Sequence, residues 1–95
     1  MSIHLTFTHI KQSEAVEEHI TDIMAELLKI TDNKFPFHIN LTKENEEHSV
    51  TINCNYKNKP LVSKANHENL YKAIAKSVDT MKTQVIKKTD KLKHV

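Results

Sequence analysis

The sequence contains no glycine, no tryptophan and no arginine, and it has a single cysteine, Cys54. One cysteine cannot form an intramolecular disulfide or a cysteine-rich metal site. A chain without glycine has no P-loop, no dinucleotide-binding fingerprint and no nucleophile elbow. Its turns must use other residues, and we expect Asn33, Asn45 and Asn58 there, because asparagine tolerates the left-handed backbone region best among residues with a side chain.

Long hydrophobic runs are also missing. The N-terminal segment lacks the apolar core of a signal peptide, and no segment approaches the apolar length of a membrane span. We therefore expect a cytoplasmic protein without membrane contact. Ninety-five residues suffice for one domain with a single modest core, and we expect that domain to span residues 1–95.

Charge is divided unevenly along the chain, although the net charge is only +2. Residues 1–50 hold four lysines and nine acidic residues, whereas residues 51–95 hold ten lysines and three acidic residues. Lysine lacks the planar fork with which arginine reads guanine or binds phosphate through two hydrogen bonds. If the partner is a nucleic acid, the composition favours phosphate contacts and recognition of shape over base reading.

Hydrophobic periodicity predicts two helices and four strands. The predicted elements, in chain order, are strand 2–8, helix 14–29, strands 35–42, 49–56 and 60–65, and a long helix after residue 66. Ser13 is a good N-cap for the first helix and Asn66 for the second. The order predicts an α+β fold, a β-α-β-β-β-α sandwich of two layers in which two helices cover one face of a four-stranded sheet. The first two strands are parallel if they are neighbours.

The strands alternate apolar and polar residues, so the other face of the sheet is predicted to be polar and uncharged. Its expected members are His4, Thr6, His38, Asn40, Thr42, Thr51, Asn53 and Asn55. Such a face suits RNA backbone or sugar, and a plain hydrated sheet has the same pattern. Phe7 and Phe37 are expected in the core, which disfavours a platform for base stacking.

The long second helix combines an apolar face with a row of lysines. The apolar residues, spaced mostly by three or four, are Leu70, Ile74, Val78, Met81, Val85 and Leu92. The lysines of the opposite stripe are Lys72, Lys76, Lys87 and Lys91, and Lys88 adds to it in the last turns. This pattern is typical of a helix that binds a polyanion and also of a solvated lysine face.

Catalytic and metal-binding patterns are weak. His4 and His38 lie on the outward faces of strands that can be adjacent, but no third and fourth ligands follow at a recognisable spacing. Cys54 alternates with buried positions and is expected to be a small buried hydrophobic residue. No nucleophile with a nearby base is indicated, so we expect no enzyme, no cofactor and no metal.

The sequence nevertheless resembles one family, the ribosome hibernation promoting factors, also called ribosome-associated inhibitors, in their short form. The resemblance rests on residues 69–74 (NLYKAI), on Asp79, Met81 and Gln84, on the lysine-rich residues 87–93, and on residues 13–16 (SEAV). The chain departs from the family pattern at Thr80 and Thr83, and at Ile23 and Glu26, where relatives often carry basic residues. These substitutions reduce the number of basic residues on the surface.

This resemblance implies a fold similar to a double-stranded-RNA-binding domain. It implies binding to the small ribosomal subunit at the rRNA of the decoding region, where such a protein blocks mRNA and tRNA without catalysis during stress or stationary phase. Short forms lack a C-terminal dimerisation domain and promote paired, inactive ribosomes together with a second small factor. We expect the same here, with a monomer off the ribosome.

Charge placement and family position together predict the rRNA-binding residues. They are Lys72, Lys76, Lys87, Lys88 and Lys91, with Lys57, Lys59 and Lys64 as a secondary group. Two alternatives stay open. One is a protein-interaction module, a modulator of an alternative sigma factor, that uses the acidic first helix. The other is a general binder of double-stranded RNA.

Overall fold

The computed structural model describes the backbone of residues 3–31 and 34–93, and the side chains of residues 3–31 and 34–87. The elements in chain order are β1 (Ile3–Thr8), α1 (Glu14–Ile30), β2 (Phe37–Glu44), β3 (Glu47–Tyr56), β4 (Lys59–His67) and α2 (Leu70–Lys93). The predicted order of strands and helices is therefore confirmed.

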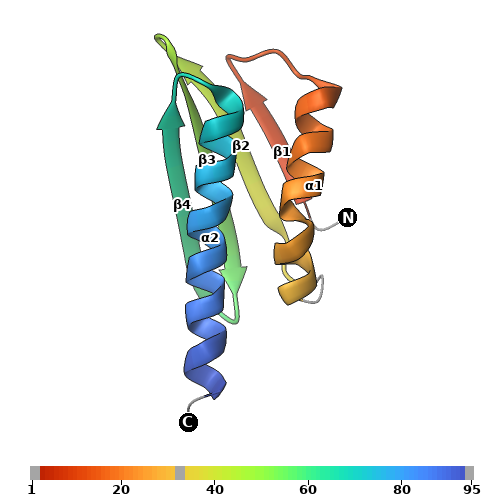
Figure 1. Ribbon diagram of the computed structural model, residues 1–95, viewed down its shortest axis with the longest axis vertical. Coiled ribbons are helices and arrows are strands. Elements are labelled where there is room, and N and C mark those ends of the chain that lie inside the picture. The colour runs from red at the N-terminus through yellow and green to blue at the C-terminus, as the bar shows by residue number, and fades with distance from the viewer. Residues whose placement is uncertain (1–2, 32–33, 94–95) are drawn as a thin grey trace.

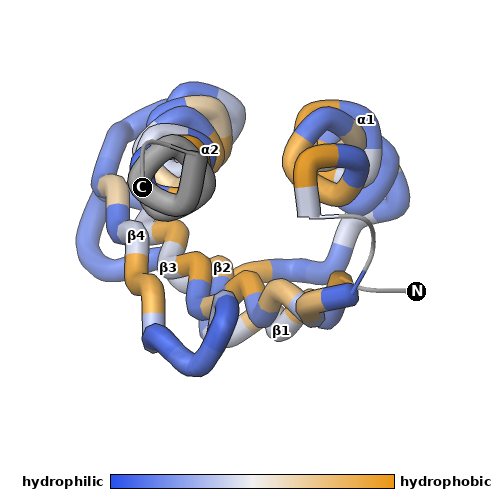
Figure 2. The backbone as a smooth tube through the Cα atoms, turned by 90° about the horizontal axis from the view of Figure 1, so that it is seen from below, coloured by the Kyte–Doolittle hydropathy of each residue, from blue (hydrophilic) through white to orange (hydrophobic). Residues whose placement is uncertain are grey.

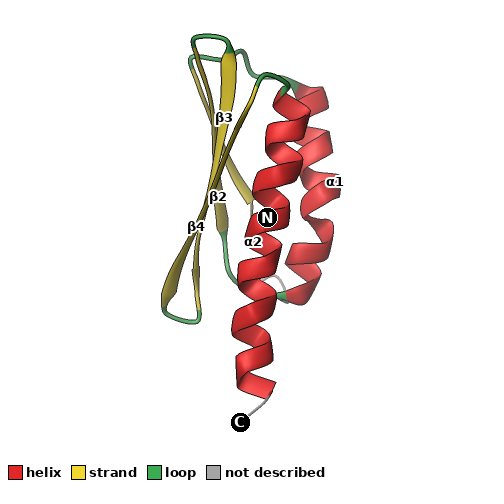
Figure 3. Ribbon diagram, turned by 60° about the vertical axis from the view of Figure 1, so that its left-hand side comes forward, coloured by secondary structure: helices red, strands yellow, loops and turns green. Residues whose placement is uncertain are grey.

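The four strands form one sheet in the order β1-β2-β3-β4. β1 pairs with β2 in parallel, as expected for neighbouring strands joined through a helix, and the other two pairs are antiparallel. Both helices start at the same end of the sheet (Figure 1) and cover the same face, so that the molecule has two layers (Figure 3). α2 packs on β3 and β4, and α1 lies over the side of β1 and β2 (Figure 2).

α1 has a cap at each end. The Ser13 hydroxyl accepts the backbone N–H of Val16 at 3.4 Å, which satisfies one of the free donors of the first turn. At the other end, the buried Thr31 hydroxyl donates to the carbonyl oxygen of Leu27 at 3.0 Å. Ser13 is thus confirmed as the N-cap.

The start of α2 differs from the prediction. Asn69 is the capping residue, because its side-chain oxygen accepts the backbone N–H of Tyr71 at 2.9 Å. The prediction of Asn66 as the cap was wrong, since β4 continues to His67. Asn66 belongs to that strand, and its side-chain oxygen accepts the hydroxyl of Ser49 on β3 at 3.0 Å.

Residues other than glycine make both hairpin turns. Asn45, with φ 57°, is the first residue of the β2–β3 turn, which is shorter than the gap between the predicted strands 35–42 and 49–56. Lys57 and Asn58 form the β3–β4 turn with φ values of 51° and 66°, the combination that matches the twist of a hairpin. Asn45 and Asn58 are confirmed as turn residues, Lys57 was not anticipated, and Asn33 lies outside the described residues.

The core fills the space between the helices and the sheet. Its largest fully buried side chains are Phe37, Ile20, Met24, Leu27, Ile39, Leu41, Ile52, Ile74, Met81, Val50 and Val85. On α1 the buried stripe is centred on Met24, because Ile23 and Ile30 are only partly buried at its edges. Phe7 packs against the core from the edge strand. Leu92, expected in the apolar stripe of α2, lies outside the described side chains.

Polar and titratable groups in the core are few. Cys54 is buried, as predicted, and burial raises the pKa of its thiol to about 11 because the thiolate would lose its hydration. Under α2, the hydroxyl of Ser63 donates to the carbonyl oxygen of Ser77 at 2.6 Å, and the Ser77 hydroxyl donates to the carbonyl oxygen of Ile74 at 2.9 Å. Both buried hydroxyls are therefore satisfied.

Candidate rRNA-binding surface

The outward face of α2 carries the main group of predicted binding residues. The helix buries Ile74, Val78, Met81 and Val85 against the sheet, so the opposite face meets solvent. Among the described side chains of α2, three lysines are exposed and have no acidic partner: Lys72, Lys76 and Lys87. Two further predicted residues belong to α2, but their side chains lie outside the described ones: Lys88 and Lys91.

Polar and acidic residues interrupt this lysine row. Asp79, Thr80 and Thr83 are exposed on the turns between Lys76 and Lys87. The hydroxyls of Thr80 and Thr83 donate to the carbonyl oxygens of Lys76 and Asp79, at 3.0 and 3.1 Å. These hydroxyls are therefore engaged by the backbone of their own helix. The cationic surface of α2 has two lysines near its start, then a gap, then Lys87.

The secondary group of predicted lysines does not form one surface. Lys57 and Lys59 lie at the β3–β4 turn, at the end of the sheet toward which α2 runs (Figure 1). The Lys57 ammonium is 5.2 Å from the ring centroid of Tyr56. Lys64 lies between the buried residues Ser63 and Ala65 of β4, so its side chain points away from the helices. Lys64 thus lies on the opposite side from the α2 row, and its role in RNA binding stays a prediction.

The face of the sheet opposite the helices is largely as predicted. The strand register places His4, His38, Asn53 and Val62 in one row across the four strands. The imidazoles of His4 and His38 stack with their centroids 4.9 Å apart and their planes at 15°. Among the described residues, no group of three or more His, Cys, Asp or Glu side chains is placed to hold a metal ion. Val62, which is 55% exposed, and Lys64 depart from the uncharged polar pattern.

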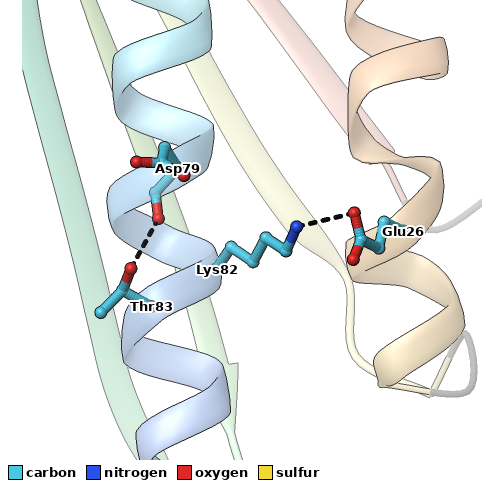
Figure 4. A network of polar contacts seen from close by, with 4 residues as sticks. All are labelled: Glu26, Asp79, Lys82 and Thr83. Carbon is cyan, nitrogen blue, oxygen red and sulfur yellow. Dashed lines mark hydrogen bonds and ion pairs between the residues drawn. The ribbon is translucent and has the colours of Figure 1, made fainter.

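Sequence reasoning missed the contacts between the helices. The Lys82 Nζ atom lies 2.7 Å from the Glu26 Oε2 atom and joins α2 to α1 (Figure 4). Nearer the start of α2, the half-exposed Tyr71 ring meets His19 edge to face, with centroids 4.9 Å apart. The one available signal was that Glu26 and Lys82 each lie next to a buried residue of their helix, at the border of the apolar stripe.

α1, in contrast to α2, carries a cluster of acidic side chains. A shallow surface hollow of α1 is lined by four acidic residues and one threonine: Glu14, Glu17, Glu18, Thr21 and Asp22. The two helices lie next to each other on the same face of the sheet (Figure 2), so the acidic residues of α1 and the lysines of α2 belong to the same layer.

Comparison with protein families identifies the chain. Residues 3–93 match the family described as Sigma 54 modulation protein / S30EA ribosomal protein. The chain belongs to this family. The resemblance to the ribosome hibernation promoting factors is thereby confirmed, and with it an association with ribosomes and with the regulation of translation. The S30EA family is one of ribosome-binding modulators and is not an enzyme family.

Solved structures show the same fold. The N-terminal domain of Thermus thermophilus Protein Y aligns with a TM-score of 0.81 at 21% identity, covering 90% of this chain and 96% of that one. A ribosomal subunit interface protein from Coxiella burnetii aligns with a TM-score of 0.84 at 18% identity, covering 95% and 99%. In the described part of the S30EA-family chain, neither helix has the length and apolar character needed to cross a membrane.

Proposed function

We propose that this S30EA-family protein is a ribosome hibernation factor of the cytoplasm. It binds the small ribosomal subunit at the decoding region, blocks mRNA and tRNA, and promotes inactive, paired ribosomes under stress, as a monomer acting with a second small factor. The observation that carries the proposal is the exposed lysine row of α2, on a chain that matches this family over residues 3–93.

The chemistry of the surface suits such a partner. Lysines that neutralise phosphates release counterions, which gives affinity that falls with salt and depends little on base sequence. The chain has no arginine for bidentate base reading, and the phenylalanine and tyrosine rings other than Tyr71 are buried in the core or packed against it. Recognition by shape and position is therefore favoured. Blocking a site on the ribosome requires binding only, and no reacting group.

Sedimentation of purified ribosomes in sucrose gradients tests this function. The protein is expected to migrate with the small subunit at low salt and to dissociate as salt rises. A heavier peak of paired ribosomes, formed with or without an added second factor, would show the pairing activity. Absence of the protein from the ribosomal fractions at low salt would refute ribosome binding.

The lysine-rich end of α2 is tested separately. Replacing Lys87, Lys88 and Lys91 by glutamate (K87E/K88E/K91E) should abolish migration with ribosomes, because three attractive charges become repulsive. The circular dichroism spectrum should be unchanged. Unchanged migration of a folded variant would remove these three residues from the binding surface.

The acidic surface of α1 favours a second candidate function, binding of a basic protein such as a sigma factor. Neutralising Glu14, Glu18 and Asp22 (E14Q/E18Q/D22N) should leave ribosome binding intact or strengthen it, because RNA is repelled by carboxylates. The same variant should lose a basic protein partner. Loss of ribosome binding on this substitution would instead show that α1 contacts a basic ribosomal protein.

A further inference from the structure

The ion pair between the helices engages a lysine, Lys82, that can also bind an anionic ligand. The 2.7 Å separation of Lys82 Nζ from Glu26 Oε2 is that of a charge-assisted hydrogen bond. Phosphate oxygens are recognised by lysine through the same kind of contact. Within the described residues, the Glu26 carboxylate is thus an anion already bound to a lysine of α2 (Figure 4).

We infer that Lys82 is a phosphate-binding residue of the RNA-binding surface and that the Glu26 carboxylate occupies its place in the free protein. Glu26 then competes with an RNA phosphate and sets the affinity of the protein for RNA. The inference rests on the proposed function, since it concerns the same surface.

The surroundings of Lys82 leave its ammonium group accessible to a ligand from solvent. Both residues of the pair line a hollow of about 140 Å³ between the helices, together with the buried residues Leu27 and Val78. The Lys82 side chain is 32% exposed and that of Glu26 is 64% exposed, so a phosphate approaching from solvent can reach both. Exposed ion pairs are weak, because water and salt screen them, and a polyanion can therefore displace the carboxylate.

The charged groups around Lys82 determine whether a substitution raises or lowers the affinity for RNA. Glu26 faces it from α1, and Asp79 lies one turn earlier on its own helix. The other α1 residues at the hollow, Ile23 and Leu27, are apolar. Removing the Glu26 charge leaves Lys82 with no bonded carboxylate among the described residues.

The test replaces Glu26 by glutamine (E26Q), which keeps the size and shape of the side chain. Freeing Lys82 from this competition should raise the affinity for small ribosomal subunits by up to roughly five- to eightfold at 0.1 M salt, the value of one whole phosphate contact, and steepen the salt dependence by up to about 0.7 to 0.9 in log–log slope. The matched control is Glu18→Gln (E18Q), which removes the same charge from an exposed position of α1 that has no lysine partner in the described structure.

A double substitution isolates the role of Lys82. In the E26Q/K82Q protein the gain should disappear, since no ammonium is left to be released. Equal effects of E26Q and E18Q, or a gain that persists in E26Q/K82Q, would overturn the inference, because the cause would then be the general field of α1.

The same variants are compared on a heparin column, which presents a polyanion without a ribosome. E26Q should elute at higher salt than E18Q and the natural protein. If the natural protein fails to bind ribosomes, the proposed function fails, and the heparin result still decides whether Glu26 masks Lys82. Identical elution of E26Q and E18Q overturns the masking itself.

Discussion

Replacing Lys72, Lys76 and Lys87 together by glutamine (K72Q/K76Q/K87Q) should weaken ribosome binding and reduce its salt dependence. The three side chains are exposed on α2 and have no acidic partner among the described residues. Their removal therefore costs no intramolecular ion pair. Glutamine has nearly the helix propensity of lysine, so α2 should stay folded.

The magnitude follows from counterion release. Each phosphate contact contributes about 0.7 to 0.9 to the log–log salt slope, so three lost contacts should lower the slope by roughly 2 to 3. At 0.1 M salt each contact is worth roughly five- to eightfold in affinity, so the triple variant should bind roughly 100- to 500-fold more weakly.

Filter binding or sedimentation with small subunits between 50 and 200 mM KCl measures both quantities. The control variant, K11Q/K29Q/K43Q, removes the same charge from three exposed lysines that lie away from α2. If the two variants lose the same slope, binding depends on net charge alone, and the reasoning from the α2 row is refuted.

Three further predictions concern the fold. Asn69→Ala (N69A) should lower the free energy of unfolding by about 0.5–2 kcal/mol through loss of the α2 cap, a larger decrease than that caused by Asn66→Ala. Urea denaturation of both variants measures the difference, and the reverse ranking would contradict the assignment of Asn69 as the cap. Met24→Ala should cost about 2–5 kcal/mol in the same assay because it opens a cavity in the core, whereas exposed Thr21→Ala should be nearly neutral; similar values for the two would show that the core is not centred there. Since burial raises the pKa of Cys54 to about 11, the unfolded chain loses the thiol proton at lower pH than the folded protein, so stability should fall between about pH 9 and 11, and this part of the fall should be missing in Cys54→Ala.

The element order and the faces of most elements could be predicted because hydrophobic periodicity is a local property of the sequence. The alternation in β2 and the three- and four-residue spacing in α2 each define a buried face without knowledge of any partner. Ser13 could be predicted for the same reason, since a cap depends on its own turn. The outward direction of the α2 lysines could also be predicted, because the buried apolar residues lie on the other side of the helix.

What could not be predicted depends on pairing between distant segments. Asn66 and Asn69 are equally good caps, and only the pairing of Asn66 with Ser49 on β3 decides that the strand continues past Asn66. Glu26 and Lys82 are 56 residues apart, and their contact depends on the distance between two helices on the sheet. The outward direction of Lys64 likewise required the register of β4 on β3.

The turns without glycine have a consequence for the balance between the folded and unfolded states. His9, Asn45, Lys57 and Asn58 all have φ values between 51° and 66°. A side chain at such a position costs roughly 1–2 kcal/mol in the folded state, least for asparagine. Compared with glycine, however, each side chain also restricts the unfolded backbone, an effect worth about 0.4–1 kcal/mol in favour of folding. Backbone strain in the folded turns is thus partly balanced by the stiffness of a disordered chain that has no glycine anywhere along its length.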